Sequence, residues 1–325
     1  MLVYSLISLL ILITVSKFSY AYNLVDQPNE RKKHPKPTAY TGGLALSFIY
    51  VISIYLFNII GQELNLILSV GLLIAIVGFI DDKYQLNTGS KLSLQIFPIF
   101  YLVIIENLSL IHIGEYNFFK LNLNTFSMPF SVICVMFLIN SFNYFDGLDG
   151  TLGFTTISTL GILYFLATDE NTKLFLITIL IPLLFFLFFN FSMLGLPKLF
   201  LGDGGSLLLG FIISFTLIFL ANQNIVHPIL LAWTISIFIF EFLSLNLARL
   251  KNRKNLFKAG LDHLHHILLK KNNSIFLTNL YICLLNIIFF IIGYLSFLFI
   301  SPLASLALFV ILFVVFFFFR TTYLV

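Results

Sequence analysis

The stretch MPFSVICVMFLINSFNYFDGLDG, residues 128–150, decides the fold class. Its first 16 residues, up to Asn143, are mostly apolar, close to the roughly 20 residues that a helix needs to cross a bilayer. Two carboxylates, Asp146 and Asp149, follow at once. Because charge in or beside a bilayer is costly, we expect a cation or a ligand to compensate them. The stretch therefore predicts a membrane span that ends at a polar site.

The whole chain has the composition of a polytopic membrane protein. Of its 325 residues, 59% are hydrophobic and 10% are charged, whereas a soluble domain is about 25% charged. We find no internal repeat and no soluble insertion, so residues 1–325 are expected to form a single transmembrane domain. The fold class predicted is an all-α bundle of about 11 transmembrane helices, at residues 2–21, 41–60, 64–80, 92–107, 128–144, 153–168, 174–190, 205–221, 228–247, 277–298 and 302–319.

The placement of Lys and Arg predicts the orientation of these spans. Cytoplasmic loops carry an excess of basic residues. With 11 spans and the N-terminus outside, 16 of the 18 basic residues fall on the inner side, and only Lys120 and Lys173 fall outside. The opposite topology reverses that ratio. We therefore expect an outside N-terminus and a cytoplasmic C-terminus.

Five polar clusters then fall on the cytoplasmic side, and nothing comparable falls on the other. They are RKKHPKPTAYTGG (31–43), DDKYQLNTGSK (81–91), NYFDGLDG (143–150), LFLGDGGS (199–206) and LARLKNRKNLFKAGLDHLHH (247–266). Each cluster also has a structural interpretation as a helix cap, a glycine turn, an interfacial helix or a basic membrane anchor. Their convergence on one side favours a single site built from several loops.

The residue types in these clusters indicate chemistry on phosphate groups. Hard oxygen ligands for Mg²⁺, which takes one or two carboxylates and shares the rest of its shell with water and phosphate oxygens, are supplied by Asp81, Asp82, Asp146, Asp149 and Asp203. Glycine-rich turns offer backbone amides to anions, and Lys, Arg and His supply donors to phosphate. A zinc site is disfavoured because no thiolate lies near the histidines. A phosphoryl site at a membrane surface suggests one lipid-anchored substrate and one cytosolic substrate.

Four motifs in this order resemble the polyprenyl-phosphate N-acetylhexosamine-1-phosphate transferases of glycosyltransferase family 4. They are DD at 81–82, NxxDGxDG at 143–150, FLGDGGS at 200–206 and HLHH at 263–266. The basic segment 31–43 fits as well, so the resemblance runs from about residue 26 to residue 266. The His-x-His-His form is similar to the branch that makes undecaprenyl-diphosphate-GlcNAc lipids.

The resemblance implies that a UDP-N-acetylamino sugar donates its sugar 1-phosphate to undecaprenyl phosphate and releases UMP, with Mg²⁺, or alternatively Mn²⁺, as cofactor. This is the first membrane step of a cell-surface polysaccharide such as lipopolysaccharide. The implied partners are these two substrates and membrane lipids, without nucleic acid, and a homodimer is left open. The implied donor is UDP-GlcNAc. The alternatives are UDP-GalNAc, a 6-deoxy amino sugar, UDP-MurNAc-pentapeptide and, from another class, a lipid transporter or flippase.

By motif match, the resemblance also implies roles for single residues. Asp203 is the implied principal metal ligand, with help from Asn143, and Asp81, Asp82 and Asp146 are the implied catalytic acids. The implied substrate-binding residues are Lys83, Asn143, Asp149, Phe200, His263, His265 and His266. Phe200 and Asp149 are implied to contact the uracil, and the histidines are implied to contact the phosphates or sugar of the donor.

The residues themselves favour direct attack by the lipid phosphate. Neighbours on a helix point about 100° apart, so Asp81 and Asp82 are expected to do different work. A phosphate monoester has a second pKa of about 6 and hardly needs a strong base. A covalent phospho-enzyme on one of the two acids is the alternative. The chain departs from many relatives in span nine, where Glu241 takes the place of an Asp and Ala248-Arg249 replaces an Arg-Arg pair.

Overall fold

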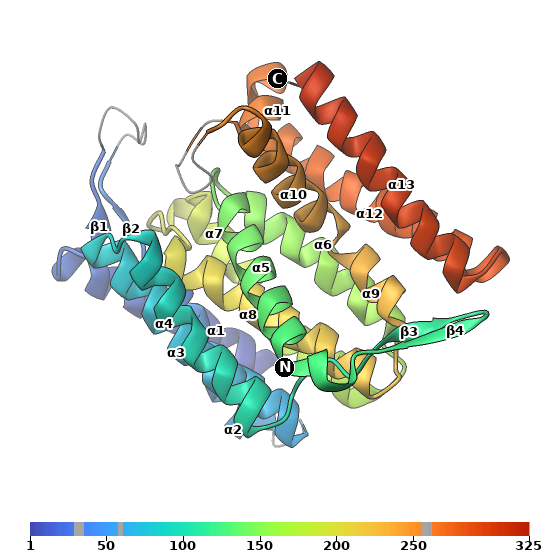
Figure 1. The fold of residues 1–325 in the computed structure, drawn as a ribbon. Helices are drawn as coiled ribbons and strands as arrows, with labels where there is room; N and C mark the ends of the chain where they lie inside the picture. Colours follow the sequence, from blue (N-terminus) through green and yellow to red (C-terminus); the bar gives the residue numbers. More distant parts are fainter. Residues whose placement is uncertain (29–35, 58–60, 255–259, 261, 325) are drawn as a thin grey trace.

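The protein is a polytopic helical membrane protein whose helices pack in one bundle (Figure 1). The computed structural model describes residues 1–28, 36–57, 61–254, 260 and 262–324. Its α-helices are α1 Leu2–Ala21, α2 Gly42–Phe57, α3 Gln62–Tyr84, α4 Thr88–Phe100, α5 Ser127–Phe145, α6 Thr151–Leu166, α7 Glu170–Asn190, α8 Gly202–Asn222, α9 Pro228–Thr234, α10 Ser236–Lys251, α11 Leu264–Asn272, α12 Ile275–Phe299 and α13 Pro302–Phe319. Short 3₁₀ turns cover Asn124–Phe126 and Met193–Gly195, and π turns cover Tyr101–Ile105 and Arg320–Leu324.

Every predicted span coincides with helix in the described part of the chain. Within it, eight helices are long and apolar enough to cross a membrane, or nine if the bent pair α9 and α10 is one span. The predicted spans 41–60 and 153–168 correspond to α2 and α6, which have only 16 residues each, and residues 58–60 lie outside the described residues. The helical class is confirmed, and the number of 11 crossings stays a prediction.

The bundle is organised around α8. Most of its residues are buried, because it contacts α2, α3, α5 and α9. Its sequence is apolar on every face, as expected for a helix surrounded by other helices. At the other extreme, only Ser305 and Phe316 are buried on α13, which lies at the edge of the bundle (Figure 1). Figure 1 also shows the two termini at opposite ends of the bundle.

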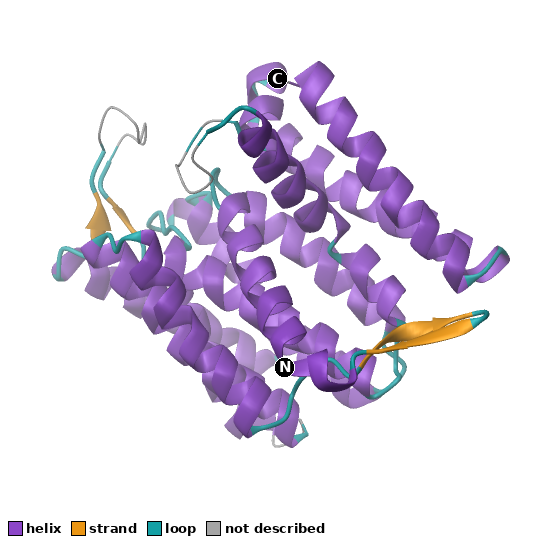
Figure 2. Cartoon of the chain, in the orientation of Figure 1, coloured by secondary structure: helices purple, strands orange, loops and turns teal. Residues whose placement is uncertain are grey.

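Two small antiparallel sheets were not predicted and qualify the all-α class (Figure 2). The strands β1 Val25–Asp26 and β2 Thr38–Ala39 pair, with the partners Val25 and Ala39. The strands β3 His112–Tyr116 and β4 Phe119–Asn122 form a hairpin in which Tyr116 faces Phe119. The hairpin lies at the same end of the bundle as the N-terminus (Figure 1).

The predicted span 228–247 is bent by 72° between α9 and α10. At the bend, the carbonyl oxygen of Thr234 accepts hydrogen bonds from Thr159 Oγ1 at 3.1 Å and Asn286 Nδ2 at 3.2 Å. Backbone polar groups inside a membrane must find protein partners, so these side chains from α6 and α12 stabilise the break. Trp233 beside it donates to Ser305 Oγ at 2.9 Å, which ties α9 to α13.

Candidate active site

Three acids of the predicted site lie at helix ends that meet. The helix α3 runs past its predicted end, so Asp81 and Asp82 lie in its last turn. The helix α8 begins at Gly202, so Asp203 lies in its first turn. The amide of Asn143, in the last turn of α5, donates to Asp203 Oδ1 at 2.9 Å and to Ser206 Oγ at 2.9 Å. Residues from three separate helices therefore meet at one point.

A lysine that the sequence analysis did not include in the site completes this cluster. The ammonium of Lys91 forms an ion pair with Asp81 Oδ2 at 2.7 Å and a second, shorter one with Asp203 Oδ2. Lys91 lies in the first turns of α4, where Asn87 caps the helix by accepting from Ser90 N at 2.9 Å. Asp81 Oδ1 accepts from Leu86 N at 2.9 Å, so one carboxylate orders both the α3–α4 turn and Lys91.

Asp82 points to a different partner from Asp81, as the helical geometry predicts. Its Oδ2 atom lies 3.4 Å from the backbone nitrogen of Gly204, at the amino end of α8. Helix N-termini carry partial positive charge and favour such a carboxylate. Gly202 has a φ of +70°, and a Cβ atom there would lie 2.6 Å from Asp82 Oδ2 and 2.4 Å from the Tyr40 carbonyl oxygen. Glycine is therefore required for this close approach.

Asp146 and Asp149 do not share a helix face, because α5 ends at Phe145 and α6 begins only at Thr151. Both acids therefore lie in the turn between α5 and α6, beyond the predicted span 128–144. Burial and, to a smaller extent, the charges of Asp203 and Asp149 together raise the pKa of Asp146 to about 8. Asp146 is therefore largely protonated at neutral pH unless a cation joins it.

Asp149 turns toward the segment before α8. Its Oδ2 atom accepts from Lys198 Nζ at 2.6 Å. The same ammonium lies 5.3 Å from the centroid of the Phe200 ring. Lys198 therefore contacts both Asp149 and Phe200, the two residues that the family resemblance assigns to the uracil. It is a second lysine for which the sequence predicted no role in the site.

Backbone hydrogen bonds hold Phe200 in place. Its amide donates to the carbonyl oxygen of Ala39 at 2.8 Å, and its carbonyl oxygen accepts from Gly42 N at 3.0 Å. The final part of the segment 31–43 thus pairs with the segment before α8. The basic residues 31–33 lie outside the described residues.

The three histidines gather against the NYFDGLDG segment. The ring of His263 packs edge-on against Tyr144, with centroids 5.2 Å apart, and the rings of His265 and His266 lie 4.3 Å apart. A Cβ atom on Gly147 would lie 2.1 Å from His265 Nε2, so the glycine permits this contact. His263 Nδ1 and His265 Nε2 are buried without a hydrogen-bond partner among the described residues.

The environment keeps these histidines neutral. Burial and, to a smaller extent, the positive charge of Arg249 together lower the pKa of His263 to about 4. Burial also lowers the pKa of His265 well below its ordinary value and lowers that of His266. At neutral pH the rings are therefore neutral hydrogen-bonding groups, and they do not add positive charge for a phosphate.

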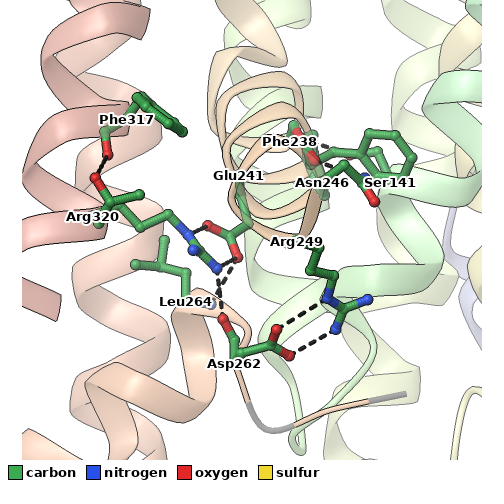
Figure 3. A network of polar contacts seen from close by, with 11 residues as sticks. Ser141, Phe238, Glu241, Asn246, Arg249, Asp262, Leu264, Phe317 and Arg320 are labelled. Carbon is green, nitrogen blue, oxygen red and sulfur yellow. Dashed lines mark hydrogen bonds and ion pairs between the residues drawn. The ribbon is translucent and has the colours of Figure 1, made fainter. Parts of the chain in front are cut away.

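An ion-pair network anchors the histidine segment (Figure 3). Arg249 in α10 donates to both carboxylate oxygens of Asp262, at 3.0 and 2.7 Å. Glu241, the residue at which the chain departs from many relatives, pairs with Arg320 at the end of α13. The segment is thereby attached to two helices. Residues 255–259 of the fifth cluster lie outside the described residues.

Lys83 is the predicted site residue that the structure does not bring into the cluster. Its side chain is exposed, with the ammonium 5.3 Å from the centroid of the Tyr84 ring. Among the described residues, no ion pair joins it to the acids. The two missed lysines had sequence signals: Lys91 follows a helix-capping Asn by four residues, and Lys198 immediately precedes the Leu-Phe-Leu-Gly-Asp turn.

The oxygen donors present fit Mg²⁺. Among the described residues, no three His, Cys, Asp or Glu side chains form a metal site by themselves. Mg²⁺ does not need such a group, since water and phosphate oxygens complete its shell. Asp81 and Asp203 already share one cation, the Lys91 ammonium, and the amide group of Asn143 lies beside them with its nitrogen donating to Asp203.

An apolar groove with a volume of about 380 Å³ runs along the same helices. Its walls are residues 133–138 of α5, residues 214–221 of α8 and the bent pair α9 and α10 around Ile235. Ser214 is the only residue with a polar side chain in its lining. Helices α5 and α8, which carry Asn143 and Asp203 at one end, therefore border an apolar channel further along.

Comparison with known proteins agrees with the motifs. The family model for glycosyl transferase family 4 matches residues 64–221. An undecaprenyl-phosphate alpha-N-acetylglucosaminyl 1-phosphate transferase of Yersinia pestis is 25% identical over 275 residues, 82% of this chain and 74% of the relative. A probable undecaprenyl-phosphate N-acetylglucosaminyl 1-phosphate transferase of Bacillus subtilis is 29% identical over 299 residues, 88% of this chain and 81% of the relative.

Proposed function

We propose that the chain, whose residues 64–221 match the model of glycosyl transferase family 4, transfers an N-acetylamino-sugar 1-phosphate from a UDP-sugar to undecaprenyl phosphate and releases UMP. GlcNAc 1-phosphate is the proposed group, because both relatives described above are named for GlcNAc. The observation that carries the proposal is the meeting of Asp81, Asn143 and Asp203 around Lys91 at the ends of three helices.

The proposed reaction is an in-line displacement at phosphorus. An oxygen of the lipid phosphate attacks the sugar-bearing phosphorus of the donor, a new P–O bond forms, and the diphosphate bond to UMP breaks. The lipid phosphate is already anionic near neutral pH. Asp82, held at the amino end of α8, orients the acceptor without having to remove a proton from it.

Mg²⁺ is the proposed cofactor, held by Asp203 with Asp81 and the Asn143 amide oxygen. When bound, it neutralises charge on the donor diphosphate and orients it. Lys91 lies within reach of the same phosphates and offers donors to them. The half-buried Asp146 adds negative charge beside the cation.

The uridine of the donor is proposed to lie against Phe200, with Asp149 accepting from the base. Lys198 holds the ring and the carboxylate in position. The neutral rings of His263, His265 and His266 supply hydrogen bonds to the sugar or its phosphate, and two of their buried nitrogens have no described partner. Lys83 lies apart from this arrangement and is assigned no contact.

The polyprenyl tail is proposed to occupy the apolar groove between α5, α8 and the bend at Ile235. From Asp203 to Ser214 is 11 residues of α8, or about 16 Å at 1.5 Å per residue. A polyprenyl chain spans that distance easily, so its phosphate and its tail contact the same two helices.

The proposed setting is a bacterial cytoplasmic membrane crossed 11 times by a single domain, with the N-terminus outside and the site on the cytoplasmic face. The distribution of basic residues supports this orientation. The position of the termini at opposite ends of the bundle agrees with an odd number of crossings (Figure 1).

The test is UMP release by purified protein given undecaprenyl phosphate and each of several UDP-amino sugars. We expect release that requires both the lipid and Mg²⁺, with UDP-GlcNAc as the preferred donor. Asp203→Asn is expected to lower the rate by at least about 100-fold, because it removes the principal carboxylate from the proposed metal site. No release with any donor, or lipid movement across vesicles without release, would refute the enzyme proposal in favour of a transporter.

Separate Asp81→Asn and Asp82→Asn variants test direct attack. With direct attack, radiolabelled donor leaves no label on either protein after the lipid is withheld. A trapped phospho-enzyme in the wild type that one variant loses would instead establish the covalent route.

A further inference from the structure

The pair of Glu241 and Arg320 is buried in the bundle, and each residue is 1% exposed. Arg320 Nε donates to Glu241 Oε2 at 2.7 Å, and Nη2 donates to Oε1 at 2.9 Å. The two partners come from helices far apart in the chain, α10 and the end of α13 (Figure 3). Two parallel bonds of this kind fix the orientation of both side chains.

The same pair holds the backbone on both sides of His263. Arg320 Nη2 also donates to the carbonyl oxygen of Asp262 at 2.6 Å. Glu241 Oε1 accepts from the backbone nitrogen of Leu264 at 2.9 Å. His263 therefore lies between two backbone groups that one ion pair binds directly (Figure 3).

The position of the histidine rings depends on this backbone. His265 follows Leu264 by one residue, and its ring fits against Gly147 with no room for a Cβ atom. The ring of His263 is packed against Tyr144. A small shift of the backbone at 262–264 therefore moves both rings relative to the segment that carries Asn143.

We propose that Arg320, acting through Glu241 and the backbone of Asp262 and Leu264, is a positioning residue that sets the histidine segment against the acid cluster. This inference rests on the proposed function for its kinetic consequence. The guanidinium group is needed because it makes three directed hydrogen bonds at once: two to Glu241 and one to the Asp262 carbonyl oxygen. A lysine keeps the charge but lacks the planar fork that makes these bonds together.

The kinetic test compares Arg320→Lys with wild-type protein, both purified in detergent and corrected for folded fraction by gel filtration. We expect kcat per folded molecule to fall about 100-fold, the scale of an error of about 1 Å in position. The KM for undecaprenyl phosphate is expected to stay within about twofold, since the groove is formed by other residues. An unchanged kcat per folded molecule would overturn the proposal.

Two further variants keep the test decisive. Replacing Glu241 and Arg320 together by Met removes the buried charges, a change that folded proteins often tolerate, and the same loss of kcat is expected. The matched control for removing an ion pair is Glu170→Gln, because Glu170 forms an exposed pair with Lys173 at 3.1 Å. Wild-type kcat in the double variant would overturn the proposal even if Arg320→Lys does not fold.

A readout independent of activity separates this inference from the proposed function. Diethyl pyrocarbonate modifies accessible histidines, and peptide mass spectrometry locates the product. His265 is 1% exposed, so we expect slow modification in the wild type and at least about tenfold faster modification in Arg320→Lys. His112 on β3 serves as an internal reference. Equal rates at His265 would overturn the inference, whereas absent UMP release by the wild type would refute only the proposed function.

Discussion

Replacing Lys91 by Met is expected to make the stability of the protein depend on a divalent cation. In the wild type, one ammonium is shared by Asp81 and Asp203. The side chains of Lys91 and Asp81 are 15% and 9% exposed, so water screens the carboxylates poorly once the ammonium is gone. Methionine has a similar length without the charge, which leaves the two acids to repel each other.

The structure sets the size of this repulsion. The ammonium lies 2.7 Å from the Asp81 oxygen and closer still to the Asp203 oxygen, so the two oxygens are at most about 5.4 Å apart. At an effective dielectric constant of about 20, two unit charges at that separation repel by about 3 kcal/mol. For a chain of this size the free-energy change corresponds to a fall of about 6 °C in melting temperature.

The assay is thermal unfolding in detergent, first in EDTA and then with increasing Mg²⁺. Lys91→Met is expected to melt about 6 °C below the wild type in EDTA and to regain most of the difference with Mg²⁺, because the proposed ligands then share a cation again. Lys173→Met, which removes an exposed ion pair, is the control and is expected to change little. Equal melting temperatures of Lys91→Met and wild type in EDTA would show that the ammonium does not hold the acids together.

Three other predictions concern the histidine segment and the helix break. The pKa values of His263 and His265 are lowered in the folded protein, so protonation of these rings favours the unfolded chain. The stability that the two neutral rings contribute is therefore complete above the ordinary histidine pKa of about 6.5, and it is lost as the pH falls from there through about 4. Melting temperatures measured from pH 7.5 to pH 5 are expected to fall, and His263→Phe is expected to flatten that fall; an equal slope in the variant contradicts the assignment. Gly147→Ala is expected to displace His265 and to lower kcat at least about tenfold. The control is Gly161→Ala, where a Cβ atom meets nothing within 4 Å and kcat is expected to stay unchanged. Similar kcat values in both variants would argue against the contact between Gly147 and the His265 ring. Asn286→Leu removes a donor from the helix break and is expected to destabilise the protein by about 0.6–2 kcal/mol in thermal unfolding, so an unchanged melting temperature means that the break does not need this bond.

Hydropathy and helix-end chemistry made the spans and the acid cluster predictable. The spans and the acid cluster both follow from local properties of the chain. An apolar run forms a helix in a membrane, and acids at the end of that helix need a positively charged partner. The limits of prediction also have local causes. The helix α8 starts at Gly202, three residues before the predicted start. The glycine-rich sequence around Asp203 indicated a loop, whereas in the structure it forms the first turn of the helix. The end of α5 at Phe145, by contrast, lies within one residue of the predicted end of the span 128–144.

The partners of these acids could not be predicted, because they come from distant parts of the chain. Lys91 and Asp203 are 112 residues apart, and Arg320 and Glu241 are 79 residues apart. One sequence gives no covariation between such positions, and a basic residue near the inner membrane surface is already explained by topology. The hairpin of β3 and β4 was missed for another reason: its strands have only five and four residues, too few for a clear alternation.

The ribosome makes Arg320 after every other residue assigned to the catalytic centre. A nascent chain that has inserted α3, α5 and α8 already carries the acids, yet its histidine segment lacks the contacts of Arg320 until α13 joins the bundle. A half-inserted intermediate is thereby prevented from consuming lipid carrier or nucleotide sugar. If Arg320 has the proposed positioning role, the docking of α13 is the step after which turnover begins.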